Sequence, residues 1–197
     1  QAENQASSVR AIRPIPILPT DYDHVFVLLA ERLIEFDAST NRTTPIRLAA
    51  DARIGRFIDL VESRDGGAWI TRERGLAKLP RPIRRVKRET LWEEFSLDPG
   101  LGMRNPEHPF EDDSGGVTMV AESIAEQKRE ILLFAKRQWQ VLPAPADRVR
   151  FAWRGNDESL WVQTRNNLWL REDGRFRLLQ QEGVLAGQYY DVAPETN

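Results

Sequence analysis

The sequence predicts an all-β fold, a β-propeller of about four blades with four antiparallel strands in each blade. Short apolar runs rich in Val, Ile, Leu, Phe and Trp are separated by Gly, Asp, Asn and Pro, which is the pattern of strands and turns. Related stretches also recur along the chain, at successive shifts of 43, 49 and 43 residues. Repeats of this length that hold four strands are the sequence form of propeller blades.

The repeat is clearest around two tryptophans. Placing Trp69 over Trp161, a shift of 92 residues, also aligns their apolar neighbours and the loop that follows. At the end of that loop Gly75 falls on Asn167. Because both residue types tolerate a positive φ, we expect a left-handed turn at both positions. In the first repeat Phe26 takes the place of Trp69.

The repeats divide the chain, read as one partial propeller over residues 1–197, into blades at residues 11–49, 54–88, 105–142 and 149–180. The strands expected in the second blade are 57–61, 68–71, 76–79 and 83–87. Those expected in the fourth blade are 149–153, 160–164, 167–171 and 175–179. The last strand of each blade is more charged, as expected of an outer edge that must not pair with other chains.

Two segments fall outside the four blades. Residues 89–104 are too long for a plain connection and predict an insertion, in which Trp92, Phe95 and Leu97 lie on a short helix that ends at residues 98–100. Residues 184–197 look like the first strand and turn of a further blade.

Composition limits the chemistry that the chain can support. It has 197 residues, enough for one domain with a sizeable core, and a net charge of −2, which gives no general attraction to nucleic acid. There are no cysteines, which excludes disulfides, thiolate metal sites and a cysteine nucleophile. The two histidines lie far apart, so we expect neither a metal site nor a cofactor.

Two stretches carry a resemblance to a known repeat: DLVESRDGGAWITRERGLAKL at residues 59–79 and RGNDESLWVQTRNNLWLREDGRF at residues 154–176. Both resemble the two-component regulator propeller repeat, in which an acidic, glycine-rich turn precedes Leu-Trp-Ile-Gly-Thr and a short loop leads to Gly-Leu. Residues 160–164 match this pattern well, with Gln163 in place of the usual glycine. The first stretch departs from it at Thr71 and Arg72, and the first and third repeats lack the tryptophan.

This resemblance implies an extracytoplasmic sensor region, periplasmic or extracellular, of the kind found in seven-bladed propellers. In that family a Y-shaped β-sandwich, a membrane helix and a cytoplasmic histidine kinase or diguanylate cyclase usually follow. The resemblance therefore implies a fragment of a longer propeller that meets the membrane only through parts absent here, and a closed four-bladed ring is the alternative. A fragment would expose apolar blade faces, through which we expect self-association.

We interpret the most conspicuous side chains as structural. Trp69, Trp161 and Trp169 occupy repeat positions and are expected to fill the space between neighbouring blades. The glycine pairs at 66–67 and 115–116 lack the context of a phosphate loop and predict hairpin turns. The acidic stretches 93–94 and 111–113 and the basic run 81–89 predict solvated turns and an edge strand.

Three functions remain open from the sequence. The first is a non-catalytic ligand-sensing region of a membrane-bound bacterial signalling protein, which binds a small molecule or glycan in the loops of one propeller face. The second is a structural propeller that mediates dimerisation, and the third is a glycan-active enzyme. The candidate ligand-binding residues are Arg72, Glu73, Arg74, Trp92, His108, Arg165 and Asn166.

Overall fold

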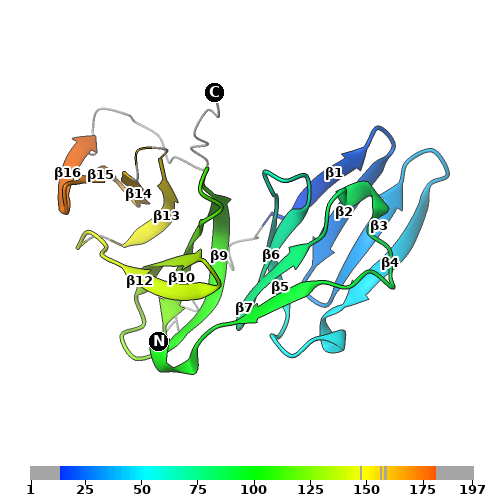
Figure 1. Cartoon of the computed structure of the whole chain (residues 1–197), viewed down its shortest axis with the longest axis horizontal. Coiled ribbons are helices and arrows are strands. Elements are labelled where there is room, and N and C mark those ends of the chain that lie inside the picture. The colour runs from blue at the N-terminus through cyan, green and yellow to red at the C-terminus, as the bar shows by residue number, and fades with distance from the viewer. Residues whose placement is uncertain (1–13, 147, 156, 158, 181–197) are drawn as a thin grey trace, which may run out of the picture.

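In the computed structural model of the chain, residues 14–180 are described, except residues 147, 156 and 158. The strands form four antiparallel sheets of four strands, and in every sheet each strand pairs with the next one along the chain (Figure 1). This arrangement confirms the predicted all-β propeller. Within the described residues, the first and last sheets lie at opposite ends of an arc, so the ring is not closed (Figure 1).

The sheets follow one another in chain order. Blade 1 consists of β1 (Ile17–Asp21), β2 (His24–Leu29), β3 (Arg32–Asp37) and β4 (Arg42–Leu48). Blade 2 consists of β5 (Phe57–Glu62), β6 (Ala68–Arg72), β7 (Gly75–Leu79) and β8 (Glu93–Ser96). Blade 3 consists of β9 (Met103–Glu111), β10 (Val117–Ser123), β11 (Arg129–Ala135) and β12 (Gln138–Leu142). Blade 4 consists of β13 (Val149–Arg154), β14 (Leu160–Thr164), β15 (Leu168–Glu172) and β16 (Arg175–Gln180).

The outer strand of blade 2 is not where the sequence predicts it. Residues 83–87 were expected to form it, but they contain the 3₁₀ helix η2 (Ile83–Arg85). Pro80 and Pro82, just before it, have no N–H to donate to β7, which explains why no strand begins here. Ile83 and Val86 of this segment are buried.

The prediction of an insertion at residues 89–104 is also wrong, because the outer strand of blade 2 lies within this segment. It contains β8, the displaced outer strand, and the connection to blade 3. Phe95 lies on this strand and not on a helix. The only helical turn of the segment, η3 (Pro99–Leu101), begins where a helix was expected to end, because the Asp98 carboxylate caps it by accepting from the Gly100 N–H at 2.8 Å. The further strand expected at 184–197 lies outside the described residues.

The register of the first two strands confirms the repeat alignment. Trp69 of β6 lies opposite Val61 of β5, and Trp161 of β14 lies opposite Trp153 of β13 at the same sequence separation. The same separation recurs in the other two blades. The pairs there are Leu18 with Phe26 and Phe110 with Thr118.

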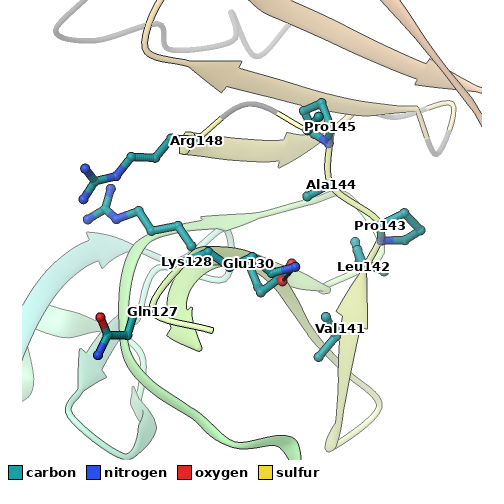
Figure 2. A pocket seen from close by; sticks show the side chains of 11 residues that line it. Gln127, Lys128, Glu130, Val141, Leu142, Pro143, Ala144, Pro145 and Arg148 are labelled. Atoms are coloured by element: carbon teal, nitrogen blue, oxygen red, sulfur yellow. Dashed lines mark ion pairs between the residues drawn. The ribbon is translucent and has the colours of Figure 1, made fainter. Parts of the chain in front are cut away.

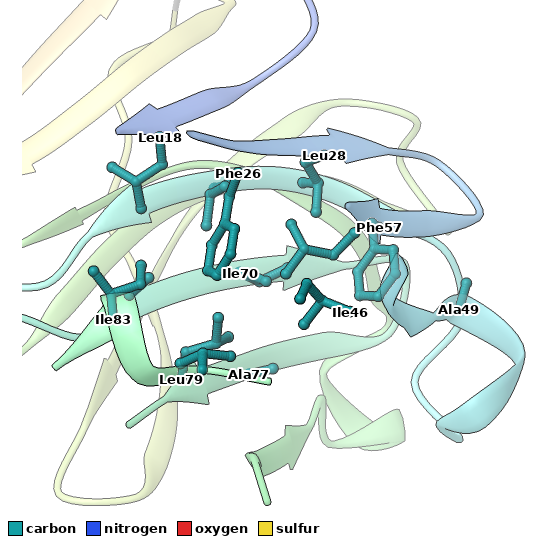
Figure 3. Packing of buried hydrophobic residues seen from close by; sticks show 14 of the residues in the cluster. Leu18, Phe26, Leu28, Ile46, Ala49, Phe57, Ile70, Ala77, Leu79 and Ile83 are labelled. Atoms are coloured by element: carbon teal, nitrogen blue, oxygen red, sulfur yellow. The ribbon is translucent and has the colours of Figure 1, made fainter. Parts of the chain in front are cut away.

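The first strand of each blade is its inner strand, and it contacts the inner strands of the neighbouring blades. β5 packs on both β1 and β9, and β9 packs on β13. Because successive side chains along a strand point to opposite faces of its sheet, one strand contributes side chains to the contacts with both neighbouring blades. Ala68 and Ile70 of β6 belong to the apolar cluster between blades 1 and 2, in which Figure 3 labels Ile70. Trp69 belongs to the cluster between blades 2 and 3.

The tryptophans at repeat positions do not all have the same surroundings. Trp69 is 6% exposed and contacts Phe95 and Phe134, so it fills the space between blades as predicted. Trp169 packs against the cluster between blades 3 and 4. Trp161 is half-buried on the far face of blade 4, where its ring stacks with Trp153 at a centroid distance of 6.2 Å.

The left-handed turn expected at Gly75 is not found. Gly75 begins β7 with a φ of 159°, and glycine is needed at this position for a different reason. A Cβ at this position would lie 2.3 Å from the carbonyl oxygen of Phe95 on β8, so glycine permits the close approach of the two strands.

We predict that Trp69→Ala destabilises the chain by about 3–5 kcal/mol, because it removes a large buried side chain from the contact between two blades. Leu91→Ala is the matched control, since Leu91 is 88% exposed and its truncation should change stability by less than about 0.5 kcal/mol. Urea unfolding followed by circular dichroism measures both. Equal midpoints for the two variants would contradict this packing role.

Candidate functional site

One end of the propeller gathers the turns between the second and third strands of each blade and the segments that join the blades. In blade 1 the turn carbonyl of Ala30 accepts from Phe57, at the start of β5, at 2.9 Å, and that of Glu31 accepts from Ala49 of the joining segment at 2.8 Å. In blade 2 the N–H of Arg74 donates to Ile54 of the same segment at 2.9 Å. These bonds place the turns and joining segments on one surface, which we call the loop face.

A cleft of about 400 Å³ opens on the loop face between blades 1 and 2. Most of its lining residues are apolar, and three polar side chains stand among them. The apolar part comes from blades 1 and 2, and Asn105 comes from blade 3. The lining residues are Pro14, Ile15, Pro16, Leu28, Leu29, Ala30, Arg56, Phe57, Ile58, Glu73 and Asn105.

Arg56 and Glu73 form the charged part of this cleft. The Arg56 Nε donates to Glu73 Oε1 at 2.6 Å, and the backbone N–H of Arg56 donates to Glu73 Oε2 at 3.1 Å. Both carboxylate oxygens are therefore used by one residue. These hydrogen bonds hold the pKa of Glu73 below its usual range, and the paired carboxylate raises the pKa of Arg56.

Arg72 does not lie in a loop, contrary to the prediction. β6 extends to include it, and its side chain is fully buried between blades 1 and 2. Its guanidinium donates to the carbonyl oxygens of Ala49 at 2.7 Å and Gly55 at 2.9 Å, and it lies 3.4 Å from Glu94. Burial lowers the pKa of Arg72, and Glu94 partly offsets that effect. Arg72 thus ties two blades together.

Trp92 belongs to the same structural contact. It packs against the cluster between blades 1 and 2, 6.2 Å from Phe57 between ring centroids, with the Arg47 guanidinium 4.9 Å from its ring. Arg47 also pairs with Glu94 at 3.6 Å. The structure therefore brings Trp92 near Arg72 but places neither in the cleft.

His108 lies on the inner strand β9, in a row with residues of the neighbouring inner strands. Its backbone N–H donates to Asp59 of β5 at 3.0 Å, and its ring lies 4.2 Å from that of Phe151 on β13. Asp59, His108 and Phe151 occupy equivalent positions in the repeat. His108 thus lies among the inner strands and outside the cleft.

The remaining candidates are spread over the loop face. Arg74 is exposed, and its guanidinium donates to the Arg53 carbonyl at 2.6 Å. Arg165 and Asn166 form the exposed turn after β14, in blade 4. Of the seven predicted residues, the structure brings only Glu73 into the cleft.

Sequence reasoning missed Arg56 and Asn105. Both stand at the start of a blade, where the chain arrives from the preceding one, and no local motif marks them. The repeat alignment carries the only signal, because a shift of 49 residues places Arg56 on Asn105.

A second hollow of about 730 Å³ lies beside blade 3 (Figure 2). Lys128 and Arg148 stand on one side of it, and Val141, Leu142 and Pro143 stand on the other (Figure 2). Lys128 pairs with Glu130 at 2.8 Å and with Glu126, and these carboxylates raise its pKa. The cleft is the better candidate, because it combines residues from three blades around a fixed charged pair.

Two kinds of feature are absent from the described part of the chain. Its histidines and carboxylates do not form any group of three or more that could hold a metal ion. It also contains no helix with the length and apolar character to cross a bilayer.

No protein-family pattern and no curated protein sequence matches this chain. Solved structures do resemble it. The extracellular domains of two proteins described as hybrid two-component systems from B. thetaiotaomicron match with TM-scores of 0.58 and 0.59, at 10% and 16% sequence identity. Each match covers 89% of this chain, and 23% and 25% of the other chain.

A protein described as a gluconolactonase also matches, with a TM-score of 0.56 at 10% identity, over 84% of this chain and 62% of its own. At such identities the likeness is one of fold. This chain spans about a quarter of the length of the two extracellular domains.

We predict that Glu73→Gln lowers the melting temperature at pH 7 by a few degrees at most, and that this difference shrinks in acid. The folded-state pKa of Glu73 lies below its unfolded value of about 4.3. Its contribution is therefore fully present above that pH and is lost as the pH falls through the folded pKa. Melting curves from neutral pH to strong acid measure the trend.

Glu62→Gln is the control for this experiment. Glu62 lies exposed on β5 and has no ion pair among the described residues, so its replacement should not show the same pH trend. A Glu73→Gln difference that stays constant through the acid range would contradict the pairing.

Proposed function

We propose that this chain is a non-catalytic ligand-sensing region of a membrane-bound bacterial signalling protein, located in the periplasm or outside the cell. The cleft between blades 1 and 2 carries the proposal, since it offers a small molecule an apolar wall and a fixed charged pair. Loops positioned by a rigid scaffold are where binding residues concentrate.

The structural comparisons support this proposal in its general form. Two of the matching structures are extracellular domains described as parts of hybrid two-component systems. They agree with the sensor family that the repeat sequence resembles, and with a location outside the cytoplasm.

The experiment is a ligand screen with a variant that fills the cleft. Ala30 is exposed and lines the cleft, so Ala30→Trp should fill it without disturbing the core. We expect at least one compound from a panel of sugars, amino acids and organic acids to raise the melting temperature of the chain, and Ala30→Trp to abolish that rise.

Ala125→Trp is the matched control, because Ala125 is exposed in the corresponding turn of blade 3, away from the cleft. It should respond as the unaltered chain does. Binding that survives in Ala30→Trp would remove the cleft from the proposal. Release of new reducing ends from a glycan would favour the enzyme alternative.

One observation favours the second candidate function, association with another copy of the chain. On the far face of blade 4, the half-buried ring of Trp161 stacks on the buried ring of Trp153, with the rings 7° from parallel. The equivalent residues of blade 2, Val61 and Trp69, pack against the next blade. The face of blade 1 that points away from blade 2 carries Ile17, which is 59% exposed and available to such a partner.

Association through this face predicts a concentration-dependent dimer that Trp161→Glu dissociates, because the substitution places a charge in the contact. Light scattering after size exclusion measures it. Tyr22→Glu, at a fully exposed turn of blade 1, should leave the dimer intact. A chain that is monomeric at every concentration would exclude this candidate.

A further inference from the structure

We propose that Arg56 binds the negatively charged head of a small organic anion, a carboxylate or a phosphate, whose apolar body lies in the cleft. The inference rests on the proposed function, because it takes the cleft to be a ligand site. It names the chemistry of the ligand and the residue that selects it.

The guanidinium of Arg56 is only partly used. Its Nε donates to Glu73, and no hydrogen bond joins either terminal nitrogen to another described residue. The Arg56 side chain is 61% exposed. A guanidinium edge with two free nitrogens matches the two oxygens of a carboxylate or phosphate, which it can bind through parallel hydrogen bonds.

The partner carboxylate fixes Arg56 and has little capacity left for a ligand. Glu73 accepts from both the side chain and the backbone N–H of Arg56. Gly55 leaves the room for this contact, because a Cβ there would lie 2.6 Å from Glu73 Oε2. Gly55 also has a φ of 87°, which favours glycine. An arginine already held in place loses less entropy when an anion binds.

The charges around the cleft favour an anion over a cation. Arg53 and Arg74 are exposed on the joining segment and turn beside Arg56. Three carboxylates oppose these arginines: Glu73, which is paired with Arg56, Glu31, which acts on Arg56 only through charge, and Glu122, which accepts from the cleft residue Asn105 and is paired with Arg104 at 3.2 Å. The local balance is therefore positive, although the chain has a net charge of −2.

The wall of the cleft determines the rest of the ligand. Leu28, Leu29 and Ile58 line it beside Arg56, and Ile15, 56% exposed, completes the apolar side. A volume of about 400 Å³ suits a ring or a short branched chain. The ligand class is thus a compact organic anion with an apolar body.

The experiment compares probes that differ in charge alone. Cyclohexanecarboxylate and cyclohexanecarboxamide have the same body, and cyclohexyl phosphate tests the second head group. Titrations followed by ¹H–¹⁵N correlation spectra report both binding and the folding of each variant. We expect the two anions to bind, the amide to bind at least about tenfold more weakly, and added salt to weaken the anions.

Two substitutions test the residue. Arg56→Gln should weaken binding of the anions at least about tenfold, and Arg56→Lys should restore it only in part, because an ammonium cannot present the guanidinium fork. Arg137→Gln is the control, since Arg137 is an exposed arginine that pairs with Glu93 at the outer edge of the propeller. It should bind as the unaltered chain does.

The outcomes separate the two proposals. If the amide binds as tightly as the carboxylate and Ala30→Trp abolishes both, the cleft is a ligand site but the anion inference is overturned. If the anions bind equally well to folded Arg56→Gln, the role of Arg56 is overturned. If none of the probes binds while a neutral sugar or amino acid from the panel does, the inference fails and the proposed function stands.

Discussion

The packing of each blade on both of its neighbours is the constraint on which the structure depends. Alternate residues of β6 face opposite sides, so Ile70 stabilises the contact with blade 1 while Trp69 stabilises the contact with blade 3. A single four-stranded sheet cannot bury both faces by itself. The same alternation places Arg72 on the side of Ile70, and its charge is tolerated there because carbonyl oxygens and Glu94 surround it.

This packing also fixes the surface on which recognition would occur. The turns and the segments between blades start where the buried strands end, and hydrogen bonds join them to one another on the loop face. The cleft residues Arg56 and Glu73 therefore belong to different parts of blade 2 but are held at 2.6 Å. A binding group held by its scaffold in this way needs little rearrangement to receive a ligand.

The sequence predicted the fold better than the site. Strands that alternate with turns at a regular spacing were recognisable, but the position of β8 was not, since it follows a proline-rich detour that the other blades lack. In a strand, Arg72 faces the same side as Ala68 and Ile70. Extending the predicted strand by one residue, to include Arg72, therefore predicts its burial. The pairing of Arg56 with Glu73 was marked in the sequence only by the repeat alignment, which places Arg56 on Asn105.

The repeat itself shows why the cleft differs from the rest of the loop face. The shift of 49 residues places Arg56 on Asn105 and Glu73 on Glu122, and Asn105 Nδ2 donates to Glu122 at 3.2 Å as Arg56 does to Glu73. The shift of 92 residues places Arg148 and Arg165 at the same two positions of blade 4. The scaffold thus keeps the positions and varies their charge. A paired arginine with free terminal nitrogens occurs at this position in blade 2, which is where the apolar cleft lies.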